Sequence, residues 1–581
     1  MFNAKLTRLS AVLLAATALV ACDDDDDISQ TPQPTNISAT AAATGDLSTL
    51  ASALDRAGLV STLEGPGPFT VFAPTDAAFD GVDADVLAGL LEEGNAELLS
   101  RVLTFHVVSG TAAFSSDLSD GQTVTTAEGG ELTIGIDGSS VTVNGANVVT
   151  ADIEATNGVI HVIDDVLVPS DTDVYETAVL TPITTTLAGA VLDAGLQEDL
   201  QGTGPFTVFA PSNAAFEALD EHAAAELSDP ANQAILQKIL AFHVLSGSEV
   251  LAADLSDGQT VTTLQGQELT FDLSDASDPK VNGVSITTTD IQVENGVIHL
   301  VDEVILPELD VVETAVLTGE TETLSAALAA AELGDALKGD GPFTVFAPVN
   351  AAFDALGTDR LDVLLDPGNQ ALLQKVLTYH VISGSAILAG DLSDGQTAQT
   401  LEGTDVTFDL SDAADPRING VSIVATDIPV ENGVIHLIDG VLTQNLDIVD
   451  VATVEGFATL VDLVDTQGLT ETLRGDNMGD GYTVFAPTDD AFAALSTVPS
   501  GEALTNTLLY HVVPATVESS ALTNGQVVST AYAGHDFTVN ITMDGVTITD
   551  ESGNTVNVVI TDVPAANGVI HAIDAVLIPT P

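Results

Sequence analysis

One ten-residue motif occurs four times in the chain and limits what it can fold into more than any other feature. The copies read TVFAPTDAAF from Thr70, TVFAPSNAAF from Thr207, TVFAPVNAAF from Thr344 and TVFAPTDDAF from Thr483. Their starts are 137, 137 and 139 residues apart. This period is much longer than the roughly 20–50 residues of solenoid repeats and is close to the usual size of a domain. We therefore expect four copies of one domain, each with its own core.

Two further motifs recur in the same order within each copy. An aromatic residue and a histidine open FHVVSG at Phe105, FHVLSG at Phe242, YHVISG at Tyr379 and YHVVPA at Tyr510. The segment NGVIH begins at Asn157, Asn295, Asn432 and Asn567. Only short connectors separate the copies. The sequence predicts domains at residues 41–170, 173–308, 310–444 and 447–580, preceded by a lipoprotein signal peptide at 1–21 and an acidic, disordered linker at 22–40.

The spacing of apolar residues changes from helical to strand-like within each copy. DLSTLASAL places Leu47, Leu50 and Leu54 on one face of a helix. TVFAP is a short apolar strand, and strands dominate the second half of each copy. The positive φ that tight hairpins need is supplied by Asp120-Gly121, Asp257-Gly258, Asp394-Gly395 and Asn524-Gly525. Each domain is therefore predicted to be α+β, with helices first and antiparallel strands after them.

The N-terminus is typical of an export signal. Lys5 and Arg8 precede an apolar run from Ala11 to Ala21, which is too short to span a bilayer. The run ends in LVAC, which resembles a bacterial lipobox, and Cys22 is the only cysteine of the chain. We expect lipidation at Cys22. The protein would then be extracytoplasmic, attached to a bacterial membrane through this lipid alone, at the periplasmic face or at the cell surface.

The charge is strongly unbalanced. The chain has 86 acidic and 11 basic residues, a formal net charge of −75. Binding to phosphates needs Lys and Arg, so this balance argues against a nucleic-acid partner. Self-repulsion of this size is reduced by salt, and we expect a halophilic or marine origin.

Together, the three motifs resemble the fasciclin-like (FAS1) domain over residues 41–580. The resemblance implies four tandem domains, each a β-sandwich or wedge with packed helices. It also implies non-catalytic roles in adhesion and in contacts with matrix or cell surfaces. Phe105 and Phe242 stand where the family usually has tyrosine in the Tyr-His pair.

Eight of the ten histidines belong to these motifs, and three roles compete for them. Catalysis needs a nucleophile within hydrogen-bond reach, and Ser109, Ser246 and Ser383 have no counterpart in the fourth copy, which has Pro514. Zinc needs three or four converging ligands, but each copy offers two histidines and no cysteine. The sequence favours buried histidines that bond backbone groups, and it predicts no enzyme and no catalytic, cofactor or metal site. The residues with this mainly structural role are Phe105, His106, His161, Phe242, His243, His299, Tyr379, His380, His436, Tyr510, His511 and His571.

Two acidic loops leave calcium open as an alternative. FDLSDASDPK from Phe271 and FDLSDAADPR from Phe408 each contain three aspartates at a spacing of three. Oxygen ligands suit Ca²⁺, although the EF-hand spacing and its glycine are absent.

The expected function is non-catalytic adhesion or scaffolding by a lipid-anchored protein that binds an envelope or matrix component. The alternative is an extracytoplasmic carrier of a small apolar ligand, which would need a large apolar pocket. Arg474-Gly475-Asp476 matches the tripeptide that integrins read on matrix proteins. It lies in a glycine loop whose residues differ between the copies, so we interpret it as an incidental turn.

Overall fold

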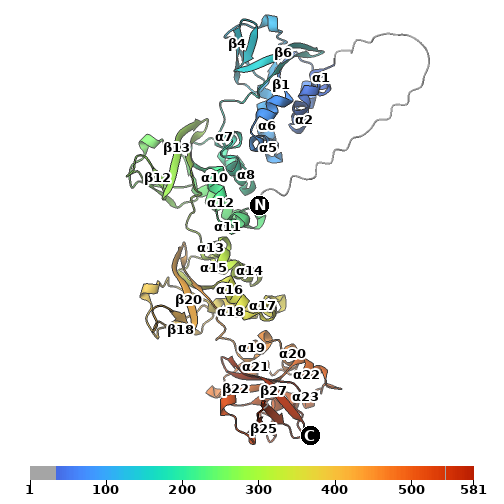
Figure 1. Cartoon of the computed structure of the whole chain (residues 1–581), viewed down its shortest axis with the longest axis vertical. Coiled ribbons are helices and arrows are strands. Elements are labelled where there is room, and N and C mark those ends of the chain that lie inside the picture. Colours follow the sequence, from blue (N-terminus) through green and yellow to red (C-terminus); the bar gives the residue numbers. More distant parts are fainter. Residues whose placement is uncertain (1–34, 544, 581) are drawn as a thin grey trace, which may run out of the picture. The chain divides into compact units, whose positions relative to one another are not determined.

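The computed structural model describes residues 35–543 and 545–580 and contains four copies of one domain (Figure 1). The chain divides into two compact units, residues 1–171 with the first domain and residues 172–581 with the other three. The predicted signal peptide, Cys22 and most of the acidic linker lie outside the described residues. The predicted fold class is confirmed, since each copy combines helices with a seven-stranded sheet.

In the first unit, domain one has α1 (Ile37–Ala43), α2 (Ser48–Arg56), α3 (Val60–Leu63), β1 (Phe69–Pro74), α4 (Asp76–Gly81), α5 (Ala84–Leu90), α6 (Ala96–Phe105), β2 (Val107–Ser109), β3 (Thr123–Thr125), β4 (Glu131–Asp137), β5 (Ser140–Val143), β6 (Ala146–Ala155) and β7 (Gly158–Ile163).

In the second unit, domain two has α7 (Val174–Leu180), α8 (Thr185–Ala194), α9 (Gln197–Leu200), β8 (Phe206–Pro211), α10 (Asn213–Glu217), α11 (Glu221–Leu227), α12 (Gln233–Phe242), β9 (Val244–Ser246), β10 (Thr260–Thr262), β11 (Glu268–Asp272), β12 (Lys280–Val281), β13 (Val284–Val293) and β14 (Gly296–Val301). Domain three has α13 (Val311–Leu317), α14 (Glu322–Ala330), α15 (Gly334–Leu337), β15 (Phe343–Pro348), α16 (Asn350–Leu356), α17 (Thr358–Leu365), α18 (Gln370–Tyr379), β16 (Val381–Ser383), β17 (Thr397–Gln399), β18 (Asp405–Asp409), β19 (Arg417–Ile418), β20 (Val421–Val430) and β21 (Gly433–Ile438). Domain four has α19 (Ile448–Val454), α20 (Ala458–Thr466), α21 (Thr470–Arg474), β22 (Tyr482–Pro487), α22 (Asp489–Ala493), α23 (Glu502–Tyr510), β23 (Val512–Val513), β24 (Gln526–Ser529), β25 (Asp536–Thr542), β26 (Gly545–Thr549), β27 (Thr555–Ala565) and β28 (Gly568–Ile573).

The sheet of each domain is mixed, which differs from the antiparallel expectation. In domain one the strand order is β2-β1-β7-β6-β5-β4-β3. The TVFAP strand β1 lies parallel to the NGVIH strand β7, with Phe72 opposite His161, and the other pairs are antiparallel. A parallel pair needs a long crossover, and here the helices and the remaining strands provide it. The first and last motifs of each copy are therefore neighbours in space.

The paired strands β1 and β7 have an apolar cluster on each face. Val71 and Ile160 pack with the helices in one cluster. Phe72 and Ile163 pack in a second cluster with Leu132 and other residues of the strands that follow. A strand covered on both faces needs a nearly continuous apolar run, which explains the composition of TVFAP and GVIHVI.

The hairpins form at other dipeptides than those predicted. Asp120-Gly121 makes a turn ahead of the edge strand β3, where the Gln122 N–H donates to the Ser119 carbonyl. One tight hairpin, between β5 and β6, has Asn144-Gly145 as its turn, with φ values of 47° and 95°. Asn-Gly at this position gives the positive φ that a two-residue hairpin requires.

The asparagine of NGVIH connects three segments of each domain. In domain two, Asn295 Oδ1 accepts the Val174 N–H at 2.9 Å, and Nδ2 donates to the Leu200 and Gly202 carbonyls at 2.7 and 2.8 Å. Its counterparts, which make the corresponding bonds, are Asn157, Asn432 and Asn567. This side chain thus ties the first helix to the loop ahead of β8 and to the start of β14.

We expect Asn295→Ala to destabilise domain two by about 2 kcal/mol or more, because each buried group left without a partner costs about 1–3 kcal/mol. Hydrogen exchange of domain-two amides, measured in the full chain, reports the change. The control is Gln292→Ala, at an exposed position of β13 close by in the sequence. Equal exchange rates in the two variants would contradict this assignment.

Candidate functional site

The histidine of each aromatic-His pair ends a helix and is buried. His106 Nδ1 donates to the Val102 carbonyl at 2.7 Å, and Nε2 accepts the Leu167 N–H at 2.9 Å. Since Nε2 accepts a backbone N–H, the ring proton lies on Nδ1. The same bonds recur at His243, His380 and His511. Burial lowers the pKa of all four imidazoles from 6.5 to about 4, although the bond to the helix carbonyl acts in the opposite direction.

In the histidine of each NGVIH segment, the donating and accepting ring nitrogens are exchanged. His161 Nε2 donates to the Ala113 carbonyl at 2.8 Å, and Nδ1 accepts the Asp152 N–H at 3.4 Å. The ring stacks on Phe72 with centroids 5.6 Å apart. The same two bonds recur at His299, His436 and His571. In domain one the ring thus joins the loop after β2 to the bulged strand β6 at Asp152, whose φ is 60°. The other three rings make the same connection in their domains.

A serine and an aspartate near His161 resemble parts of a hydrolytic triad but are connected differently. Ser115 Oγ donates to Asp152 Oδ2 at 2.5 Å, while His161 Nδ1 lies 3.9 Å from Asp152 Oδ1. The serine therefore bonds the carboxylate instead of the imidazole. Domains two and three have Ala252 and Ala389 at this position, and both still donate a backbone N–H to the aspartate. The recurring part of the cluster is thus the backbone bond.

The aromatic residue of the pair lies in the second apolar cluster of each domain. Phe105, Phe242, Tyr379 and Tyr510 are all buried. The Tyr510 hydroxyl donates to the Asp536 carbonyl at 2.9 Å, and burial raises its pKa to about 12. The structure thus places the Tyr-His pair inside the domain and not on its surface.

The acidic loops use their carboxylates internally. Asp272 accepts from the N–H and hydroxyl of Ser274, and Asp275 accepts from those of Ser277. Asp278 pairs with Lys280 at 3.2 Å. Over residues 35–543 and 545–580, no group of three or more His, Cys, Asp or Glu side chains is arranged to hold a metal ion.

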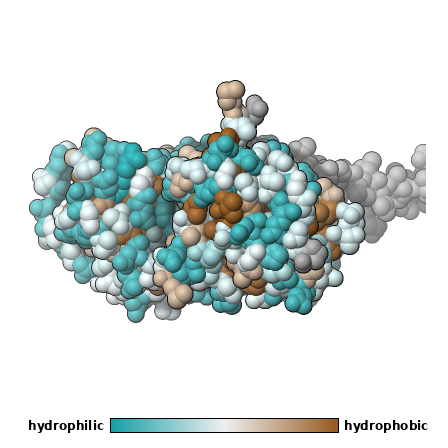
Figure 2. Space-filling model, turned by 90° about the horizontal axis from the view of Figure 1, so that it is seen from below, coloured by the Kyte–Doolittle hydropathy of each residue, from teal (hydrophilic) through white to brown (hydrophobic). Residues whose placement is uncertain are grey.

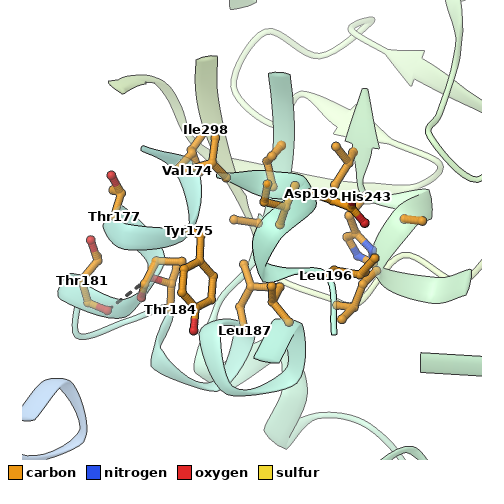
Figure 3. Close-up of a pocket in the computed structure, with 18 of the residues that line it drawn as sticks. Val174, Tyr175, Thr177, Thr181, Thr184, Leu187, Leu196, Asp199, His243 and Ile298 are labelled. Atoms are coloured by element: carbon orange, nitrogen blue, oxygen red, sulfur yellow. Dashed lines mark hydrogen bonds between the residues drawn. The ribbon is translucent and has the colours of Figure 1, made fainter. Parts of the chain in front are cut away.

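Domain two contains a small apolar cavity (Figure 3). Its volume is about 40 Å³, and Val174, Tyr175, Leu187, Leu196 and Ile298 are among its lining residues. The corresponding cavities of domains four and three measure about 30 and 10 Å³. A cavity of roughly 150 Å³ is known to hold benzene, so none of these could enclose a lipid tail as it stands.

The Arg-Gly-Asp tripeptide is held by its own domain. Arg474 Nη1 lies 2.9 Å from Asp447 Oδ2 and 2.9 Å from Asp450 Oδ1. The Asp476 side chain accepts the Met478 N–H within the loop. The guanidinium is therefore already paired with two carboxylates.

The face shown in Figure 2 is mostly hydrophilic, with smaller hydrophobic areas. One exposed apolar position recurs on the long bulged strand. Val149, Val424 and Val559 are 55, 55 and 53% exposed, and domain two has Thr287 there. Within the described residues, no helix is both long and apolar enough to cross a membrane.

These features define a modular protein of four repeated α+β domains whose shared motifs bond within each domain. Residues 45–169, 182–307, 319–444 and 455–579 match the model of the Fasciclin domain. The chain belongs to the fasciclin domain family.

Several known proteins are similar to long stretches of the chain. Transforming growth factor-beta-induced protein ig-h3 of Sus scrofa is 32% identical over 536 residues, covering 89% of this chain and 74% of that protein. Periostin of Homo sapiens is 28% identical over 541 residues, covering 90% of this chain and 61% of periostin, which is less than two thirds of its length. A solved FAS1 domain pair from the insect cell adhesion molecule Fasciclin I is 19% identical, with a TM-score of 0.23, over 46% of this chain and 96% of that one.

The buried histidines should make stability depend on pH. The four rings of the aromatic-His pairs have a folded-state pKa of about 4 against an ordinary 6.5, so the unfolded chain binds more protons between these values. Stability should therefore fall as the pH drops from about 6.5 to about 4. The loss is about 3 kcal/mol per domain, since one pKa unit corresponds to about 1.4 kcal/mol. Urea unfolding at pH 7 and pH 5 should show about 2 kcal/mol of this loss, because pH 5 lies about 1.5 pKa units below 6.5. Equal stability at both pH values would contradict the assignment.

Proposed function

We propose that the chain is a non-catalytic adhesion or scaffolding protein, attached to a bacterial membrane by a lipid on Cys22. In this role its domains bind a protein or another matrix or envelope component through their outer surfaces. The observation that carries the proposal is the hydrogen bonding of the eight motif histidines. Both ring nitrogens of each are bonded to backbone groups, so these residues serve the fold. What remains for recognition is an outer surface that is repeated four times.

Membership of the fasciclin domain family supports an adhesive role. Repetition supports it physically, because weak sites on linked domains add through avidity when the partner is also repetitive. The recurrent exposed valine of the bulged strand gives an example of a surface feature shared by three domains.

The carrier alternative has less support. A site that carries a small apolar molecule usually has a volume of about 300–1,000 Å³. The largest of the apolar cavities described above measures about 40 Å³. A carrier would have to open this cavity severalfold before it could hold its ligand.

The anchoring part of the proposal is tested by Cys22→Ser. We expect this variant to move from the membrane fraction to the soluble fraction, because buried acyl chains contribute about 0.8 kcal/mol per CH₂ group. Cells that carry the variant should also adhere less to each other or to their matrix. Ser29→Ala, in the linker, is the control. A Cys22→Ser protein that still fractionates with membranes would contradict anchoring, and unchanged adhesion by cells that release it would contradict the adhesive role.

A further inference from the structure

Two lysines lie at junctions between domains, one between domains two and three and the other between domains three and four. Lys238 on α12 places Nζ 2.8 Å from Glu313 Oε2 and 2.6 Å from Glu431 Oε2, both in domain three. The second lysine repeats this arrangement one domain further on. Lys375 on α18 places Nζ 2.6 Å from Asp450 Oδ2 and 3.5 Å from Asp447 Oδ2, both in domain four. Each lysine thus bonds two carboxylates of the domain that follows.

Three of these four carboxylates, Glu313, Asp447 and Asp450, belong to the N-terminal part of the next domain's first helix, and Glu431 lies in the turn between β20 and β21. Asp310 caps α13, and Glu313 completes a capping box with it. Asp447 caps α19 by accepting the N–H groups of Val449 and Asp450. Acidic groups are favourable at a helix N-terminus because they accept free N–H groups and oppose the helix dipole. Here they carry negative charge into a junction, and the lysine of the preceding domain offsets part of it. At the second junction Arg474 of domain four pairs with the same two carboxylates as Lys375.

These ion pairs are more shielded from solvent than ordinary surface pairs. The side chains of Lys238 and Glu313 are 16 and 12% exposed, and those of Lys375 and Asp450 are 25 and 4% exposed. Burial lowers the pKa of Lys238, but the bonds and charges of Glu313 and Glu431 more than offset this, and the net shift is upward. The ammonium group therefore stays charged. Salt screens partly buried pairs much less than exposed ones.

Packing accompanies the charges at both junctions. His222 on α11 donates from Nε2 to the Val316 carbonyl of α13 at 2.9 Å. Arg360 on α17 pairs with Glu455 after α19 at 2.9 Å. One apolar cluster contains buried residues of both domain three and domain four. The face made by α11 and α12, or by α17 and α18, thus receives the first helix of the next domain.

The placement of the lysines is selective. The whole chain has only 11 basic residues, and three of them occupy the same position of α6, α12 and α18. Arg101 of α6 pairs with Glu128 of its own domain and with Asp171, and the other two are Lys238 and Lys375. The corresponding residue of domain four is Asn506, which donates to the Tyr532 hydroxyl of its own domain at 3.3 Å. Within the second unit, lysine is present where the structure docks a following domain, and asparagine is present where the described residues dock none.

We propose that Lys238 and Lys375 are interdomain locks that hold domains two, three and four as one rigid unit against their mutual repulsion. The docking surface is the α11–α12 or α17–α18 face of one domain, and its occupant is the first helix of the next. The locks fix the spacing of the repeated outer surfaces. This inference goes beyond the adhesive role, because it holds whatever the partner is.

Spin labels on the soluble Cys22→Ser protein test the first lock. Ser256 and Ser393 are exposed in corresponding turns of domains two and three, and cysteines there accept the labels. We expect a single narrow distance in the parent protein and the loss of that narrow distance in Lys238→Met. Methionine keeps an apolar stem of similar length and removes the charge. The matched control is Lys280→Met, which removes an equal charge from a lysine paired within its own hairpin, and it should leave the narrow distance unchanged.

A second pair of labels, at Ser393 and Thr523, tests Lys375→Met in the same way. Far-UV circular dichroism verifies that the domains stay folded. If Lys238→Met does not fold, Glu431→Gln tests the first lock by removing the charge of the lysine's partner in domain three. A narrow distance that survives loss of the lysine charge would overturn the proposal and show that packing alone holds the domains. An equally broad distribution of label distances in the Lys280→Met control would also overturn the proposal. The change in net charge, and not the loss of the ion pair, would then explain the broadening.

Discussion

The parallel pairing of the TVFAP strand with the NGVIH strand is the interaction on which each domain depends. It sets Phe72 opposite His161 in domain one and places one apolar cluster on each side of the paired strands. The helices cover one side, and the later strands fold over the other (Figure 1). Strands buried on both faces leave loops around them with unpaired backbone groups. The motif asparagine and the two histidines bond these groups, which explains why the three motifs occur together in every copy.

Because the motif residues are used inside each domain, binding of a partner must depend on other parts of the molecule. Residues that recur most strictly are used inside the domain, so they say little about a partner. The outer surface and the junctions between domains remain, and both carry the consequences of a net charge of −75. Domains that repel each other need specific contacts to stay docked. The second unit places scarce lysines at those contacts, where the next helix presents buried carboxylates.

Much of this architecture could be predicted from the sequence, because it depends on local patterns. The 137-residue period, the order of helices and strands, and the buried character of GVIH follow from spacing and apolar content. The parallel pair could not be predicted, since it joins segments about 90 residues apart and leaves no periodic signal of its own. The hairpin position was wrong because Asp-Gly and Asn-Gly permit the same backbone, and only pairing decides between them. The partners of Lys238 lie 75 and 193 residues away, so only the recurrence of a basic residue at a fixed position could have drawn attention to it.

The most direct test of the account is the protonation pattern of the ring nitrogens, observed by long-range ¹⁵N–¹H NMR correlations at pH 7. The geometry requires two opposite neutral tautomers in each domain. His106 and its three counterparts should carry the proton on Nδ1, and His161 and its three counterparts should carry it on Nε2. Four rings of each kind, with ring protons that exchange slowly with water, would support motifs that serve the fold. Protonated or rapidly exchanging rings would contradict it, because they would show imidazoles free for chemistry or ligand binding.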